Sequence, residues 1–204
     1  MLASARLDEA RRHARDLAPA LGKLLDQQGW KARDLDAVFV SRGPGSYTGL
    51  RVGIVSAKTL AYATGCVLLG IDTFAAIALQ APAEAVRIDV LEDAHQGRVY
   101  VQSFKNDAET PWTATNALSI QRLDDWLTDR DVSAWITGPG VRAYSSRLSG
   151  KLCVVPANDW HPRAESLLAL GLPRYLASEH DDPWTLEPLY LRPSAAEEQR
   201  KNQG

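Results

Sequence analysis

The alternation of apolar and polar positions predicts short strands and helices along the first eighty residues. Leucines spaced three and four positions apart, followed by Gly29, predict a helix over residues 7–28, in which Pro19 produces a kink or a fresh start near Asp16. The next predicted elements are a strand over 36–40, a helix over 48–64 ending at Gly65, a strand over 66–71 and a helix over 73–80. This alternation is typical of a parallel, doubly wound α/β sheet.

The pattern changes after Pro82, where strands follow one another. Residues 86–92 and 98–104 read as two strands joined by the turn DAHQG, and residues 112–120 add a third strand, so an antiparallel insert is expected. The later elements are strands over 134–136 and 152–155, helices over 141–148 and 163–176, and an extended tail from 187 to a frayed end at 204.

This change of pattern predicts two lobes. We expect residues 1–81 to form the first lobe and residues 82–204 the second. The chain is expected to cross first within residues 81–85, and the late helix is able to return to the first lobe.

Composition narrows the class of protein. The chain has 204 residues, 45% of them hydrophobic, and a formal net charge of -2, which lacks the basic footprint of an independent nucleic-acid binder. Cys66 and Cys153 lie far apart in apolar stretches, as is typical of reduced cytosolic thiols. Because no apolar run approaches the length of a membrane span and the start resembles no signal peptide, a soluble cytoplasmic protein is expected.

The stretch SRGPGSYTGLRVG, residues 41–53, carries three glycines and a proline within seven positions. A phosphate-binding P-loop needs Lys and then Ser or Thr after its last glycine, whereas Leu50 and Arg51 follow Gly49. A nucleophile elbow needs G-x-S-x-G, whereas Ser46 directly follows Gly45. The pattern therefore favours a structural loop between a strand and a helix.

In this interpretation each residue of the loop has a structural role. Ser46 or Thr48 caps the helix, Gly43 and Gly45 supply positive φ angles, and Pro44 stiffens the turn. The free N–H groups at such a helix start are still able to bind an anion or a carboxylate of a partner.

Small residues recur every four positions in the predicted helix. Gly49, Gly53, Ala57 and Ala61 share one face, which allows another element to approach closely. Glycine in a helix costs about 1 kcal/mol relative to alanine, so packing should compensate. Two interpretations stay open: the chain's own sheet lies under this face, or a helix of a partner does.

In the partner interpretation, the leucine-rich helix lies alongside and completes the interface. That helix contributes Leu17, Leu21 and Leu24, while Arg51 and Lys58 make polar contacts at the margins.

Other polar residues give weaker signals. The histidines, His13, His95, His161 and His180, show no pair one helical turn apart of the kind that ligates a metal. Asp93 and His95 fit an acid and base, but a polar turn explains them more simply. The six tryptophans are scattered and are expected in the core or between the lobes.

Several motifs occur together, in order, from about residue 13 to residue 200. They are RHARDLAP, DAVFVSRGPGSYTGLRVGIVSAKTLA, VLEDAHQGRVYVQSF, ITGPG, PRAESLLALG and PLYLRPSAAEEQR. With these motifs the chain resembles the TsaB (YeaZ) family. The resemblance implies a two-lobed fold of the actin, Hsp70 and sugar-kinase type with ribonuclease-H-like topology.

The same resemblance implies a noncatalytic accessory subunit for the synthesis of N6-threonylcarbamoyladenosine in tRNA. The implied partners are the catalytic subunit TsaD, which is related to the old glycoprotease label, and the ATPase TsaE. It implies no cofactor, indirect contact with tRNA, no membrane, and a homodimer when the subunit is alone.

The sequence departs from the family in two places. The family begins with a strand of the type ILAIDTS and further strands, whereas MLASA offers none, so we expect a first lobe without its opening strands, through a shifted gene start or a true truncation. Many relatives read GDG where this chain has Gly138-Pro139-Gly140, which argues against metal or phosphate chemistry there.

The leading hypothesis is a binding module that uses the small-residue face with the leucine-rich helix. The alternatives are a glycoprotease-like hydrolase that uses Ser46 or a metal, and an actin-like nucleotide-binding protein.

Overall fold

The computed structural model describes residues 2–7, 13–107, 112–148 and 152–191. The chain divides into a first unit built on Met1–Ile71 and Leu167–Tyr190 and a second unit built on Asp72–Ser166. The division therefore falls after Ile71 and not after residue 81. The reason is that the helix α3 (Thr73–Ala78) packs on strands of the second unit.

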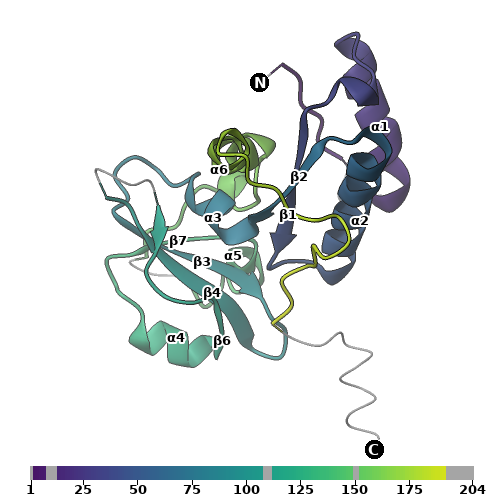
Figure 1. Ribbon diagram of the computed structural model, residues 1–204. Helices are drawn as coiled ribbons and strands as arrows, with labels where there is room; N and C mark the ends of the chain where they lie inside the picture. Colours follow the sequence, from purple (N-terminus) through teal and green to yellow (C-terminus); the bar gives the residue numbers. More distant parts are fainter. Residues whose placement is uncertain (1, 8–12, 108–111, 149–151, 192–204) are drawn as a thin grey trace, which may run out of the picture. The chain divides into compact units, whose positions relative to one another are not determined.

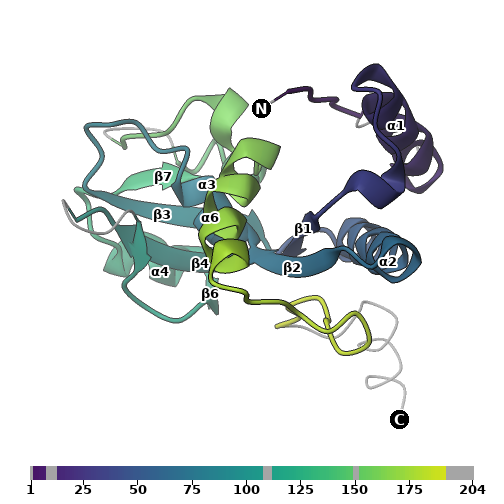
Figure 2. The ribbon, with the colours of Figure 1, turned by 45° about the horizontal axis from the view of Figure 1, so that its top comes forward.

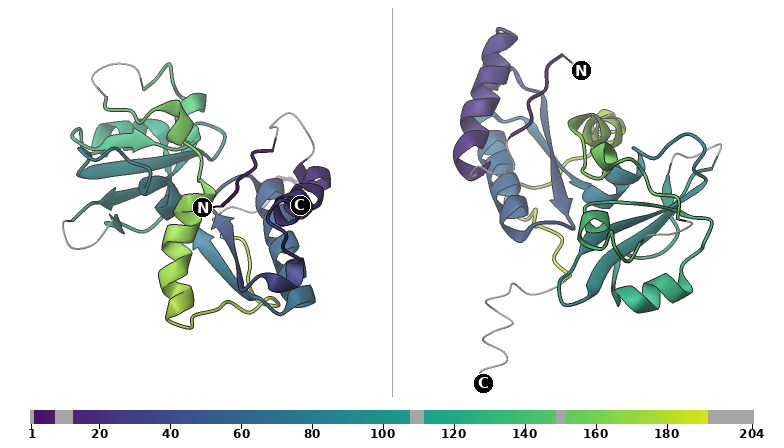
Figure 3. Two further views of the ribbon diagram at one scale, coloured as in Figure 1. Left: turned by 90° about the horizontal axis from the view of Figure 1, so that it is seen from above. Right: turned by 180° about the vertical axis from the view of Figure 1, so that it is seen from behind.

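The first unit is a strand–helix–strand crossover with helices on both faces. Its elements in chain order are α1 (His13–Gln27), a 3-10 turn (Ala32–Asp34), β1 (Ala37–Gly43), α2 (Tyr47–Thr64) and β2 (Val67–Asp72). Strands β1 and β2 form a two-stranded sheet within the described residues. In Figures 1 and 3, α1 and α2 lie side by side on one face of this sheet, and α6 (Ala164–Leu176) covers the other.

Most predicted elements of this unit are confirmed, with shifted ends. The helix expected from residue 7 is wrong at its start, because residues 2–7 are not helical and α1 is described from His13, while residues 8–12 lie outside the described chain. Pro19 lies inside α1, which continues through it. The strand β1 runs beyond residue 40 to Gly43, and α2 ends at Gly65, whose φ of 76° makes it the left-handed cap.

The second unit contains a mixed sheet. Its strands are β3 (Arg87–Asp93), β4 (Arg98–Lys105), β5 (Thr113–Ala114), β6 (Ser119–Arg122) and β7 (Trp135–Thr137). The predicted hairpin is confirmed, because β3 pairs with β4 antiparallel, and β7 then joins β3 in parallel. The predicted strand over 112–120 is wrong as one element: β5 and β6 pair separately with β4.

The helices of the second unit differ more from the prediction. The helix α4 (Leu123–Asp129) was not predicted, because its 7 residues are too few for the apolar spacing of Leu123, Trp126 and Leu127 to repeat, although its acidic first turn is typical of a helix start. The helix expected over 141–148 is reduced to α5 (Gly140–Ala143), and the strand expected over 152–155 is a single bridge between Val154 and Ile136. A second 3-10 turn spans Ala157–Asp159.

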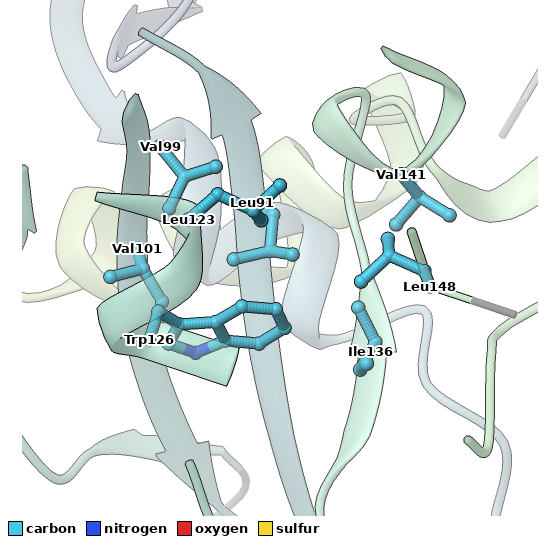
Figure 4. Close-up of a cluster of buried hydrophobic side chains, with 8 residues drawn as sticks. All are labelled: Leu91, Val99, Val101, Leu123, Trp126, Ile136, Val141 and Leu148. Carbon is cyan, nitrogen blue, oxygen red and sulfur yellow. The ribbon is translucent and has the colours of Figure 1, made fainter. Parts of the chain in front are cut away.

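Two hydrophobic clusters fill the second unit. The first packs the indole of Trp126 from α4 against β3, β4 and β7, as Figure 4 shows, and also contains Leu91, Val101 and Ile136. The other cluster contains Phe74 and Ile77 of α3. Among the tryptophans, Trp126 is in the core as predicted and Trp112, Trp135 and Trp160 pack against these clusters, whereas Trp30 and Trp184 are exposed, which corrects the prediction for both.

A buried carboxylate ties α4 to the sheet. Asp89 of β3 is 4% exposed and accepts hydrogen bonds from Ser103 Oγ at 2.7 Å and Trp126 Nε1 at 3.2 Å. The guanidinium of Arg130 lies nearby, with Nε 3.9 Å from Asp89 Oδ2. Burial raises the pKa of Asp89, while these donors oppose that effect. The four residues therefore act as one polar network inside the sheet layer.

A second carboxylate, Glu92, lies at the end of β3. Burial raises its pKa to about 7, although the backbone N–H of Asp93 donates to its Oε1 at 3.1 Å. The Gly138 and Gly140 backbones pack directly on this strand end, since a Cβ at Gly138 would stand 2.2 Å from the Leu91 carbonyl oxygen. Only glycine fits there, because Gly138 also has a φ of 101°.

We predict that Glu92 makes the protein less stable as the pH rises from about 4.5 to about 7. The folded state keeps the Glu92 proton over this range while the unfolded state releases it, so the free energy of unfolding falls by as much as about 3 kcal/mol. Glu92→Gln, which keeps an acceptor for Asp93, should flatten this part of the profile in urea unfolding measured at several pH values. An unchanged slope in the variant would contradict the assignment.

Candidate partner interface

The glycine loop ends β1 and starts α2. Gly43 has a φ of 120°, and a Cβ there would lie 3.1 Å from the Leu189 carbonyl oxygen and 3.2 Å from Leu50 Cδ1. The peptide bond between Gly43 and Pro44 is cis, and both residues are buried. Ser46 is the N-cap, because its Oγ accepts from the Gly49 N–H at 3.3 Å, while Thr48 is exposed in the first turn. Gly45 is half-buried, and these contacts support the structural interpretation of the loop.

Two tyrosines that the sequence did not single out hold Arg51 beside this loop. The rings of Tyr47 and Tyr190 stack with centroids 4.9 Å apart. The Arg51 guanidinium lies over the Tyr47 ring at 4.4 Å, and its Nε donates to the Tyr190 hydroxyl at 3.1 Å. Arg51 therefore binds aromatic groups of its own unit instead of only flanking an interface.

The small-residue face of α2 packs inside its own unit. Ala57 and Ala61 are 6% and 3% exposed and lie in a cluster with Ile54, Leu68 and Leu186. A Cβ at Gly53 would lie 3.7 Å from a methyl of Val40 in β1. The prediction that this face receives a partner helix is therefore wrong, because the sheet beneath already occupies it; only Gly49, at the helix start, is exposed.

The leucines of α1 are divided between contact and solvent. Helix α1 packs along α2, with Leu17 and Leu24 half-buried, while Leu21 is 38% exposed. Lys58 is half-buried on α2. These residues therefore mainly join two helices of the same unit, and Leu21 remains accessible.

An apolar surface lies on the opposite side of α2. Val55 and Tyr62, seven positions apart on one face, are 60% and 73% exposed. Trp184 is 77% exposed and packs edge-on to Tyr62 with ring centroids 5.6 Å apart. Between them, the Thr59 hydroxyl donates a hydrogen bond to the Val55 carbonyl at 2.8 Å. We call Val55, Thr59, Tyr62 and Trp184 the outer face; periodicity alone did not reveal it, because Trp184 comes from a loop far along the chain.

The acid and base considered in the turn after β3 serve its structure. Asp93 Oδ1 accepts from the His95 N–H at 2.8 Å and from the Tyr144 hydroxyl at 2.6 Å. Burial and this hydrogen bond raise the pKa of Tyr144 to about 12. His95 is mostly exposed and has a φ of 61°, as a tight turn requires. The polar-turn interpretation is therefore supported.

Within the described ranges, no three side chains of His, Cys, Asp or Glu gather as metal ligands would. The described helices likewise include none long and apolar enough to cross a membrane. Cys66 is half-buried and Cys153 exposed, and both are free thiols. The tail residues beyond 191 and the side chain of His13 lie outside the described part of the chain.

Comparisons with known proteins match this fold and nearly the whole chain. Residues 8–127 match the family model described as TsaD, tRNA N6-adenosine threonylcarbamoyltransferase. The tRNA threonylcarbamoyladenosine biosynthesis protein TsaB of Escherichia coli is 27% identical, over 91% of this chain and 83% of the relative. An uncharacterized protein of Mycobacterium tuberculosis is 30% identical over 90% of this chain and 77% of its own length.

A solved structure gives the same result for the fold. YeaZ from Pseudomonas aeruginosa superposes with a TM-score of 0.75 at 27% identity, covering 89% of this chain and 85% of the other. The expected fold class, α/β of the actin, Hsp70 and sugar-kinase type, is confirmed by these matches.

We predict that Ala57→Trp disrupts packing in the first unit. An indole at a site that is 6% exposed must displace Leu68 or Leu186, and overpacking of this kind costs about 1–3 kcal/mol or more. The matched control is Ala63→Trp at an exposed position of the same helix, which should unfold like the unmodified chain. Equal urea midpoints for the two variants would show that Ala57 does not face the sheet.

Proposed function

Because this chain belongs to the TsaD family and, within it, to the TsaB (YeaZ) group, we propose that it is an accessory subunit for the synthesis of N6-threonylcarbamoyladenosine in tRNA. In this role the chain is noncatalytic and binds a TsaD-like catalytic subunit. A TsaE-like ATPase joins the assembly, which works in the cytoplasm. The partners hold the tRNA, because this chain has a net charge of -2 and lacks the positive charge that binds phosphates.

In this proposal the catalytic subunit binds to the exposed apolar outer face. Val55, Tyr62 and Trp184 expose large apolar or aromatic surfaces side by side, and aromatic side chains dominate the energetics of protein interfaces. Leu21 of the neighbouring helix α1 is also accessible. The outer face therefore replaces the small-residue face as the docking surface for the catalytic subunit, and for self-association when that subunit is absent.

The polar groups of the glycine loop and of the turn after β3 support a noncatalytic role. The Ser46 hydroxyl oxygen accepts from the backbone at the start of α2, and the Asp93 carboxylate accepts from its own turn and from Tyr144. A nucleophile needs a base within hydrogen-bonding reach, and the contacts of Ser46 involve backbone instead. These groups are used for structure, which is the reason we prefer a scaffold to a hydrolase.

We predict that Val55→Glu weakens binding to the TsaD-like subunit at least about tenfold. The reason is that the carboxylate must be desolvated in an apolar contact. Val132→Glu is the matched control, since Val132 is an exposed valine of the second unit, 83% accessible. Isothermal titration with the catalytic subunit measures both, and circular dichroism verifies the fold. Equal affinities of the two variants would remove the outer face as the docking surface.

We also predict that Ser46→Ala leaves tRNA modification by the reconstituted assembly unchanged. Loss of the N-cap should lower the free energy of unfolding by about 1 kcal/mol, because the Gly49 N–H loses its acceptor. Threonylcarbamoylation of tRNA and urea unfolding are measured on the same preparation. A loss of activity at full stability would instead favour a catalytic serine.

A further inference from the structure

An open hollow lies in the first unit, at the end of α6. It has a volume of about 360 Å³, and it is lined by the first residue of β2, the last turn of α6 and the segment that follows: Val67, Tyr175, Leu176, Ser178, Glu179 and His180. This volume is typical of sites that bind small molecules, which measure about 300–1,000 Å³. All six residues belong to the same unit, and none of them belongs to the glycine loop or the outer face.

Hydrogen bonds to β2 hold the frame of this hollow in place. Beyond α6 the chain runs along β2 toward α2, as Figure 2 shows. There, Asp181 N donates to the Leu68 carbonyl at 2.8 Å, and Asp181 Oδ2 accepts from the Gly70 N–H at 2.7 Å. Arg174 Nη1 donates to the Gly70 carbonyl at 3.0 Å, and Arg174 Nε donates to Glu179 Oε2 at 2.8 Å. The frame of the hollow therefore does not depend on a ligand.

The turn after α6 leaves several acceptor oxygens without a partner. Ser178, with a φ of 60°, donates its N–H to the Tyr175 carbonyl, and the Glu179 N–H donates to the Arg174 carbonyl, each at 2.9 Å, so these bonds close the helix. The Leu176 carbonyl and the hydroxyls of Tyr175 and Ser178 have no hydrogen-bond partner within the described ranges. Three residues that line the hollow therefore offer oxygen lone pairs to a donor.

The charges around the hollow are mainly negative. The carboxylates of Glu179 and Asp181 outnumber the guanidinium of Arg174, and the C-terminal end of α6 adds the negative end of its helix dipole. Arg174 binds Glu179 through Oε2, so Glu179 Oε1 is left without a hydrogen-bond partner in the described chain. This arrangement attracts a cation and repels an anion.

Apolar side chains supply the rest of the lining. Val67 and Tyr175 are half-buried, and Leu176 is 73% exposed. Such a surface packs against methylene groups, and an aromatic ring also attracts a cation. A metal ion would need at least three carboxylate, imidazole or thiolate ligands together, and the described residues bring no such group together. The lining therefore fits an organic cation with an apolar stem better than a metal ion.

We propose that this hollow binds a primary alkylammonium group, either of a free amine or of a lysine side chain on a partner protein. The three N–H donors of the ammonium bind the Glu179 carboxylate, the Leu176 carbonyl and the Ser178 hydroxyl. Its methylene groups pack on Val67 and Tyr175. This site is separate from the outer face, so the proposal does not depend on the proposed function.

The test is a titration of the full chain with n-butylammonium chloride, followed by the NMR shifts of backbone amides. Saturable shifts are expected at Val67 and over residues 175–181, with a dissociation constant of about 1–10 mM. At equal ionic strength, n-butanol and butyrate should bind at least about tenfold more weakly, because they lack the positive charge. Equal shifts with butyrate, or no saturable shifts with butylammonium, would overturn the proposal.

N-acetyl-lysine amide, titrated in the same way, distinguishes the two sources of the ammonium group. Tighter binding than that of butylammonium would support a lysine side chain as the natural ligand, and weaker binding would support a free amine. Either result is consistent with an ammonium site in this hollow.

Two variants with matched controls locate the binding of butylammonium. Glu179→Gln removes the carboxylate and should raise the dissociation constant about fivefold, whereas Glu187→Gln, at an exposed position of the same segment, should not. Leu176→Lys places an ammonium at the hollow and should abolish binding, whereas Val132→Lys, at an exposed valine of the second unit, should not. Circular dichroism establishes that each variant is folded. Binding unchanged in both Glu179→Gln and Leu176→Lys would overturn the proposal.

Discussion

The close packing of α2 on its own two-stranded sheet is the constraint on which the first unit depends. Alanine at 57 and 61, and glycine at 53, let the helix approach Val40 and Leu68 more closely than larger side chains would permit. Because this contact fixes the rotation of α2 about its axis, it also determines which side chains of α2 point away from the sheet. Val55 and Tyr62 consequently face solvent. The accessible surface of α2 is therefore formed by these larger side chains and not by the small-residue face.

The segment 181–190 also packs on the first unit. The segment 181–190 returns to the first unit, where Asp181 covers the outer edge of β2, Leu186 joins the core and Tyr190 stacks on Tyr47. The same segment adds Trp184 to the outer face. One edge and one helix flank are thereby closed by the chain itself, whereas Leu168 and Leu172 of α6 remain accessible.

In the second unit, two carboxylates are held by neighbouring backbone and side chains. Asp89 is held by Ser103, Trp126 and Arg130, and Asp93 by its own turn and Tyr144. A buried carboxylate that accepts several hydrogen bonds stabilises one arrangement of its donors. Gly138 and Gly140 add to this packing, because without a Cβ their loop lies directly on the backbone of β3.

The sequence by itself determined the order of most helices and strands, the structural character of the glycine loop and the resemblance to the TsaB group. These follow from local signals: apolar spacing predicted α2 and the β3–β4 hairpin, Ser46 and Gly65 marked the ends of a helix, and contiguous motifs carried the family. The helix α4 was missed because its 7 residues are too few for its apolar spacing to repeat. Only the tertiary structure decided whether Ala57 and Ala61 face the sheet or a partner, since a small-residue stripe fits both equally well. It likewise brought Trp184 to Tyr62, because contacts between distant segments depend on how the whole unit packs and not on the spacing of residues within one element.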